Sequence, residues 1–241
     1  MIAAEHLYVV LLASMAGAAM PVGALLARFD LMHPALLGPN SRHFIVAFGG
    51  GALLSAVALV LVPEGSSKLS LLSASACFAA GGAFFYCLGT FLEKSRSSAG
   101  QLVAMLADFL PEAIALGTAV ATGEETVLLL AMLMVLQNIP EGFSAYEELV
   151  DEPEVASRKI LIAFSALALT GPLCALAGYL LLAHAHQFVG GLMLFASAGI
   201  LYLVFQDIAP ESRVSNSGIP AIGAVAGFSV GLIGNMLITT A

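Results

Sequence analysis

Residues 101–121, QLVAMLADFLPEAIALGTAVA, form an apolar run long enough to cross a lipid bilayer, yet they contain Asp108, Pro111 and Glu112. A carboxylate near the bilayer centre costs roughly 2.5–3.5 kcal/mol on insertion scales, so an acid at that depth generally has a function. The proline removes a backbone N–H and frees the carbonyl oxygen of Ala107, one turn earlier in the helix. This segment therefore predicts a transmembrane helix with polar oxygen atoms at mid-membrane.

The next apolar run, residues 126–146, repeats this arrangement with Pro140 and Glu141, and Pro140 frees the carbonyl oxygen of Leu136. Gln137 lies one turn before Glu141, so the two share a helical face. Because only a few residues separate the two runs, their helices are expected to be antiparallel neighbours.

The composition indicates that lipid surrounds most of the chain. Of its 241 residues, 60% are hydrophobic and 10% are charged, and the mean hydropathy is +0.99. Soluble domains carry about 25% charged residues. The net charge of −8 comes without a basic stripe, which argues against nucleic acid as a partner.

We predict an all-α, polytopic membrane protein with eight transmembrane helices in a single domain, residues 1–241. No basic region precedes the first apolar run, so we expect it to be retained as a span rather than cleaved as a signal peptide. The expected spans are at about residues 6–27, 44–63, 69–91, 99–121, 126–146, 159–182, 189–208 and 217–238.

The basic residues predict the orientation of these spans. Seven of the eight Lys and Arg residues fall in odd-numbered loops, and only Lys68 falls in an even-numbered one. Cytoplasmic loops carry the excess of basic residues, so the odd loops are expected in the cytoplasm and both termini outside. The odd-loop residues are Arg28, Arg42, Lys94, Arg96, Arg158, Lys159 and Arg213.

Pro-Glu pairs also end the second and seventh spans, at Pro63-Glu64 and Pro210-Glu211. Spans two and seven run in opposite directions, as do spans four and five. We therefore expect inverted repeats of three spans on each side of a central antiparallel pair, a 3+2+3 arrangement. Secondary transporters bind substrate at such repeat interfaces. Asp207 and Glu211 would then border the exit.

The central pair of spans gathers oxygen-bearing side chains at one depth. Asp108 and Glu112 are four residues apart and share a helical face. At about 1.5 Å per residue from the connecting loop, Asp108 comes level with Asn138. Hard divalent cations prefer several carboxylate and carbonyl oxygens. Alternatively, these acids are protonated or hydrogen-bonded to each other and only fix the helix register. The candidate metal ligands are Asp108, Glu112, Gln137, Asn138 and Glu141.

These residues resemble the ZIP (Zrt/Irt-like) family of divalent-metal transporters. That family carries H-N-x-P-E-G in its fourth span and [HQ]-[ND]-x-P-E-G in its fifth, which form a binuclear metal centre. The run QNIPEG, residues 137–142, fits the fifth-span pattern, and the resemblance extends over nearly the whole chain. It implies eight spans, termini outside the cell and transport of a divalent metal.

The chain departs from the family pattern at the metal centre. In the fourth span Asp108 stands in place of a histidine, Phe109 in place of an asparagine and Ala113 in place of a glycine. In the sixth span Gly171 precedes Pro172, where the family typically has a glutamate. These departures favour one metal over the two of the family, held by oxygen ligands. Oxygen favours manganese, magnesium, calcium or ferrous iron, and zinc stays open because it also binds carboxylates.

The expected function is transport of a divalent metal of the zinc, iron or manganese class into the cytosol, across the cell (inner) membrane. The metal is the transported substrate, no catalytic cofactor is expected, and the protein is not expected to be an enzyme. Lipid is the other partner, and a homodimer is left open. Two alternatives remain: a transport-inactive regulatory or structural membrane protein derived from such a transporter, and an intramembrane hydrolase with Asp108 and Asp207 as paired acids.

Two clusters near the membrane surfaces each have two interpretations. His184 and His186, in the loop after the sixth span, could collect metal at an entrance or be solvated surface residues. The acidic stretch from Glu147 to Glu154 could receive released cations or be a solvated loop.

Overall fold

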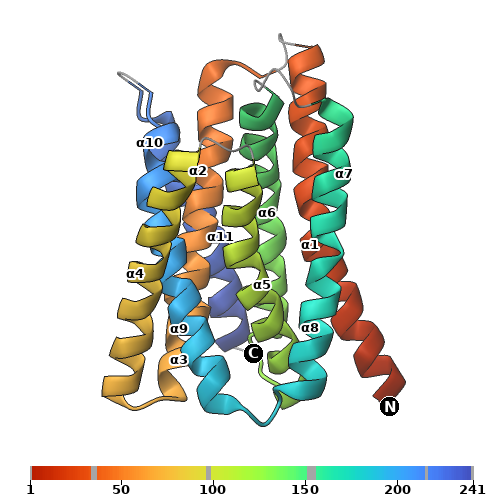
Figure 1. The fold of residues 1–241 in the computed structure, drawn as a ribbon, viewed down its shortest axis with the longest axis vertical. Coiled ribbons are helices and arrows are strands. Elements are labelled where there is room, and N and C mark those ends of the chain that lie inside the picture. The colour runs from red at the N-terminus through yellow and green to blue at the C-terminus, as the bar shows by residue number, and fades with distance from the viewer. Residues whose placement is uncertain (1, 34–36, 96–98, 151–155, 215–216, 240–241) are drawn as a thin grey trace.

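A computed structural model of the chain describes residues 2–33, 37–95, 99–150, 156–214 and 217–239 (Figure 1). Over these ranges all regular elements are helices and no strand is present. The α-helices are α1 (Ile2–Met32), α2 (Pro39–Ala56), α3 (Val62–Ser67), α4 (Leu71–Ser95), α5 (Ala99–Thr122), α6 (Val127–Val150), α7 (Ser157–Ala168), α8 (Thr170–Leu181), α9 (His186–Leu203), α10 (Ala209–Glu211) and α11 (Ile219–Thr239). Two π-helical turns, η1 (Val57–Leu61) and η2 (Val204–Ile208), complete the set.

Eight helical stretches within the described residues are long and apolar enough to cross a membrane, which confirms the all-α prediction and the number of spans. They are Ala4–Met32, Asn40–Ser67, Leu71–Leu92, Met105–Thr122, Val127–Val150, Ser157–Leu181, His186–Glu211 and Ile219–Thr239. The first span extends five residues past its expected end at 27. The second and seventh are each built from an α-helix, a π turn and a short α-helix.

The helices pack as two groups. The most extensive interfaces are α2 with α11 and α1 with α6, followed by α5 with α8 and α4 with α9. We call α1, α5, α6, α7 and α8 the α6 bundle, and α2, α3, α4, α9, α10 and α11 with the two π turns the α2 bundle. The bundles meet mainly where α2 packs on α6 and α5 on α9. In Figure 1 α4 and α1 mark the two outer sides, and both chain ends lie at the lower end.

The second and seventh spans share one local geometry. In each, a five-residue π turn is followed by an α-helix whose second residue is proline, Pro63 in one and Pro210 in the other. The N–H of the residue after each turn bonds five residues back, from Val62 to Val57 and from Ala209 to Val204. Single π turns inside helices occur frequently at functional sites.

The interface between α1 and α6 depends on two glycines that face each other's helix backbone. A Cβ added to Gly142 would lie 2.2 Å from the carbonyl oxygen of Met20, and one added to Gly23 would lie 2.0 Å from that of Ile139. Transmembrane helices associate through close packing at small residues, because in lipid the hydrophobic effect does not drive helices together. Gly142 therefore fixes α6, and with it Glu141, against α1.

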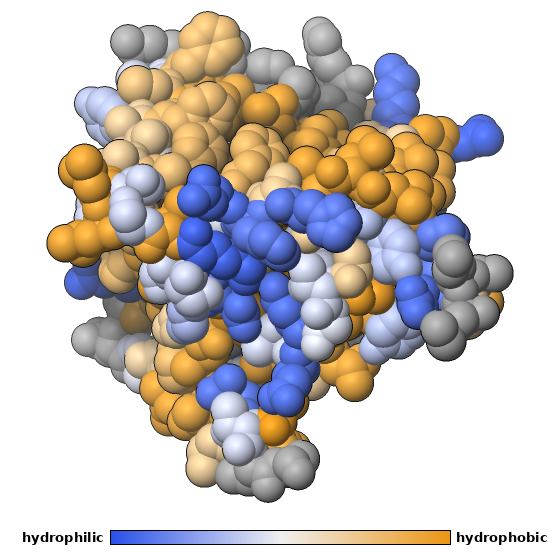
Figure 2. All heavy atoms as spheres, turned by 90° about the horizontal axis from the view of Figure 1, so that it is seen from below, coloured by the Kyte–Doolittle hydropathy of each residue, from blue (hydrophilic) through white to orange (hydrophobic). Residues whose placement is uncertain are grey.

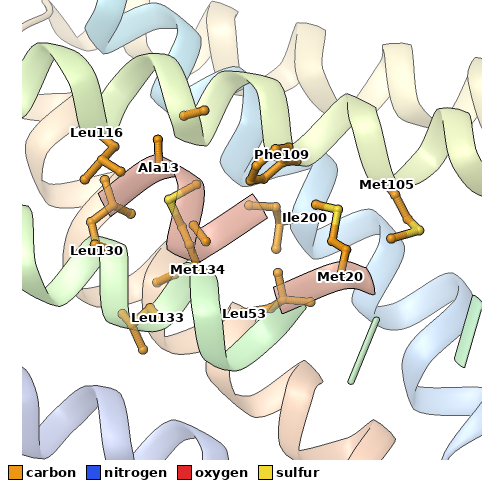
Figure 3. Packing of buried hydrophobic residues seen from close by; sticks show 14 of the residues in the cluster. Ala13, Met20, Leu53, Met105, Phe109, Leu116, Leu130, Leu133, Met134 and Ile200 are labelled. Carbon is orange, nitrogen blue, oxygen red and sulfur yellow. The ribbon is translucent and has the colours of Figure 1, made fainter. Parts of the chain in front are cut away.

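The outside of the helix assembly is apolar and its interior is close-packed. Large side chains such as Leu71 and Leu181 are 86% and 77% exposed, as expected where lipid is the solvent. Figure 2 shows the lower end of the assembly, where hydrophilic side chains gather across the middle and hydrophobic side chains surround them. Inside, Met20 of α1, Leu53 of α2 and Phe109 of α5 belong to one buried cluster (Figure 3).

Candidate metal centre

The five candidate ligands lie on two antiparallel helices, Asp108 and Glu112 on α5 and the others on α6. The helices are joined by a short turn in which Gly123 has a φ of 70°, a conformation that glycine adopts readily. Four of the five side chains are buried: Asp108, Glu112, Gln137 and Asn138 are at most 3% exposed. Glu141 is half-buried.

One hydrogen bond ties the two helices together at the centre. Gln137 Nε2 donates to Glu112 Oε2 at 2.7 Å. The second oxygen of this carboxylate, Glu112 Oε1, and the amide oxygen Gln137 Oε1 are both buried and have no hydrogen-bond partner. Buried polar atoms are nearly always satisfied, so two adjacent unsatisfied oxygens indicate a place for a cation, a proton or a water molecule.

Asp108 and Glu141 line a cavity that has ≈ 70 Å³ of space for water molecules. A single water needs about 10–15 Å³ on this measure, so the cavity has room for a hydrated ion. Asp108 Oδ1 accepts a hydrogen bond of 2.8 Å from the N–H of Phe109, whereas Glu141 Oε2 is buried without a partner. Ser144, Asp207 and Glu211 line the same cavity.

The structure thus divides the predicted ligand set. Asp108 and Glu141 reach the cavity, while Glu112 and Gln137 are bonded to each other and do not line it. Asn138 was expected to be a ligand at the depth of Asp108. Its Nδ2 instead donates to the carbonyl oxygen of Ala16 on α1 at 2.8 Å. Within the described residues, no group of three or more His, Cys, Asp and Glu side chains is arranged to hold a metal ion. The expected five-ligand cage is therefore not assembled in this conformation.

Acidic side chains are nevertheless concentrated here. Glu112 lies near Asp108, and Glu141 lies near both, so a negative charge on one of these acids disfavours a negative charge on the others. In the part of the chain that the structure describes, no lysine, arginine or histidine forms an ion pair with any of the three. Buried carboxylates without a counter-charge are stabilised by binding a cation or a proton.

Two departures from the family pattern contact each other. Phe109 is 1% exposed, and its ring lies against Gly171; both residues differ from the ZIP pattern that the sequence resembles. A Cβ on Gly171 would lie 2.6 Å from Phe109 Cζ. The phenyl ring therefore occupies space next to α8 that a longer side chain at residue 171 would need.

Asp207 and Glu211, which the sequence predicts at an exit, both line the cavity that contains Asp108. Ser144 lines it too and was not among the predicted site residues; it is 9% exposed and lies three residues after Glu141, on the same face of α6. The spacing of three residues from Glu141 could have identified Ser144 as a residue of the site. His184 and His186 are both exposed at the α8–α9 connection. Of the acidic stretch, Asp151, Glu152 and Glu154 lie outside the described residues.

No family model matches the chain, and no curated protein matches it.

Proposed function

We propose that this protein transports a divalent metal cation into the cytosol through the site between α5 and α6. The observation that carries the proposal is a set of three acids in the interior, the buried Asp108 and Glu112 and the half-buried Glu141. They have no basic partner among the described residues, and Asp108 and Glu141 line a cavity with ≈ 70 Å³ of space for water molecules. An intramembrane carboxylate is costly, and a passing cation supplies the charge that stabilises it. The resemblance of residues 137–142 to the ZIP motif supports the same conclusion.

Access to the site is one-sided in this conformation, which suits a carrier. The cavity extends from Asp108 towards Asp207 and Glu211, at the α10 end of the assembly. On the other side of the Glu112–Gln137 bond, Leu116 and Leu133 are fully buried in the hydrophobic cluster (Figure 3). A cation bound at Glu141 would reach the α10 end more directly than the opposite one.

We assign the α10 end to the cytosol. The described odd-loop basic residues belong to the helix ends and connections on this side (Figure 1): Arg28, Arg42, Lys94, Arg158, Lys159 and Arg213. Arg96 lies outside the described residues. By the positive-inside rule both termini then lie outside. We place the protein itself in the cell (inner) membrane. The matching π turns in spans two and seven support the inverted 3+2+3 arrangement.

The packing suggests which parts move. Helices α5 and α6 pack with α1 and α8, whereas α2 packs with α11 and α9 with α4. All five candidate ligands therefore belong to the α6 bundle. Movement of this bundle against the α2 bundle would expose the site alternately to the two sides.

One observation favours a second candidate. Asp108 and Asp207 line the same cavity, as the intramembrane hydrolase alternative requires. Incubation of the purified protein with a peptide library in detergent tests it, because a hydrolase with paired acids loses cleavage in both Asp108→Asn and Asp207→Asn.

The test of transport is metal uptake by vesicles that contain the purified protein, with Mn, Fe, Zn, Cd, Co and Mg in competition. Uptake of at least one metal is expected, and Glu141→Ala should reduce it by about tenfold or more, as removal of groups that support a metal typically does. Glu125→Ala, at an exposed acid outside the site, is the control. Absence of uptake with every metal would support the transport-inactive alternative.

A further inference from the structure

Two clusters of ion pairs join the α6 bundle to the α2 bundle, one at each end of the assembly. At the α10 end, Arg42 of α2 contacts Asp30 of α1 at 2.6 Å and Glu147 of α6 at 3.1 Å. Both acids belong to the α6 bundle, and Asp30 is only 3% exposed. In the part of the chain that the structure describes, both acidic partners of Arg42 therefore lie on the opposite bundle, and Arg42 ties three helix ends together.

At the opposite end the basic residue is Lys68, which follows α3. Its Nζ lies 3.0 Å from Glu64 Oε2 on its own bundle and 3.1 Å from Glu124 Oε1 in the turn between α5 and α6. Burial lowers the pKa of Lys68, but the hydrogen bonds and charges of the two acids outweigh it and raise the pKa overall. The ammonium group thus stays charged between the bundles.

The surroundings of the Lys68 cluster strengthen its pairing. The side chains of Lys68 and Glu124 are 13% and 16% exposed, so solvent and salt screen the pair less than they would on an open surface. Glu124 Oε1 also accepts a hydrogen bond from Thr122 Oγ1 at 3.2 Å, and Glu124 Oε2 is buried without a partner. Glu124 is therefore held in place by its own bundle while it contacts Lys68 of the other.

The two clusters differ in what their basic residue retains when the bundles separate. Lys68 would keep Glu64, four residues earlier on the same chain segment, and would keep its hydrogen bond to the Glu64 carbonyl oxygen at 3.3 Å. Arg42 would lose both acidic partners at once. Separation at the Lys68 end is consequently the less costly of the two.

We propose that the contact between Lys68 and Glu124 is a reversible latch that closes the bundles at the end away from the cavity, whereas the Arg42 cluster is an anchor that stays formed when the latch opens. The latch deepens the proposed transport function, because its opening would admit cation from outside. An open latch increases the distance between the two bundles at the Lys68 end, and that distance can be measured without any metal.

The experiment uses the full chain in lipid vesicles, with two spin labels and electron–electron distance measurement. One label pair, at Leu72 and Glu125, spans the Lys68 end, and both sites are exposed. A second pair, at Leu31 and Asn40, spans the Arg42 end. The described free cysteines are first replaced by serine at Cys77, Cys87 and Cys174.

Glu124→Gln removes the contact between bundles and keeps the shape of the side chain. It should raise the open population across Leu72–Glu125 by about fivefold, the ratio that corresponds to roughly 1 kcal/mol. The matched control is Glu64→Gln, the same chemical change on the Lys68 side of the latch, which should leave the closed distance unchanged. The Leu31–Asn40 distance should be unchanged in both. If Glu124→Gln does not fold, Lys68→Met replaces it.

An unchanged distance in Glu124→Gln, or equal opening in Glu64→Gln, would overturn the latch. Metal uptake is measured separately on the same vesicles. Opening of Glu124→Gln without uptake in any variant would keep the latch and contradict transport. Uptake with no opening would contradict the latch alone.

Discussion

Replacement of Gly142 by alanine should separate α6 from α1. The new Cβ would lie 2.2 Å from the carbonyl oxygen of Met20 and 2.9 Å from its Cα, and both are backbone-fixed atoms that cannot rotate away. Relief requires a displacement of roughly 1 Å, and a gap of that size forfeits about a quarter to a half of the dispersion energy of the contacts along the interface. Overpacking of this kind costs about 1–3 kcal/mol.

The assay is thermal unfolding of the purified protein in detergent, compared with Gly82→Ala. A Cβ at Gly82, in the middle of α4, meets nothing within 4 Å. Because alanine favours helix over glycine by about 0.5–1 kcal/mol, the control should be neutral or slightly more stable. At about 2–4 °C per kcal/mol for a chain of this length, Gly142→Ala should lower the midpoint by roughly 2–12 °C. Equal midpoints in the two variants would refute the proposed contact between α1 and α6.

Three further outcomes follow from the contacts described. Gly171→Glu alone should destabilise the protein by about 1–3 kcal/mol, because its Cβ meets the buried ring of Phe109, and Phe109→Asn should recover most of the loss in the same unfolding assay. With Asp108→His added to that pair, competitive uptake should shift towards zinc, and unchanged selectivity would count against the ligand assignment. Arg42→Met should cost about 3 kcal/mol, since Asp30 is left buried without a counter-charge, whereas Lys68→Met should cost about 1 kcal/mol or less; similar losses would contradict the distinction between anchor and latch.

The number of spans, and the meeting of two of the acids at one cavity, could be predicted from the sequence. Apolar runs of about twenty residues have few alternatives in a chain with 10% charged residues, and Asp108 and Glu141 interrupt two of those runs near their middle. Both side chains do reach one cavity. A charged residue within a hydrophobic segment indicates a functional site, because its insertion into lipid costs several kcal/mol of free energy.

The rotation of each helix could not be predicted in the same way. Lipid-facing and interior positions are both apolar, so the sequence has little periodic contrast to show which face of α6 meets α1. Asn138 was grouped with the acids from its depth alone, but it bonds to Ala16 because Gly23 and Gly142 bring α1 close to α6. The contact between Phe109 and Gly171 joins two residues far apart in the chain, and only the packing of α5 on α8 reveals it.

If the acids between α5 and α6 hold a divalent cation, the purified protein should bind Mn²⁺ at that site. Electron paramagnetic resonance of free Mn²⁺ should show a saturable site in the native chain, lost in the double variant Asp108→Asn/Glu141→Gln and retained in Glu125→Gln. Saturable binding that is the same in all three proteins, or its absence from the native chain, would contradict the claim.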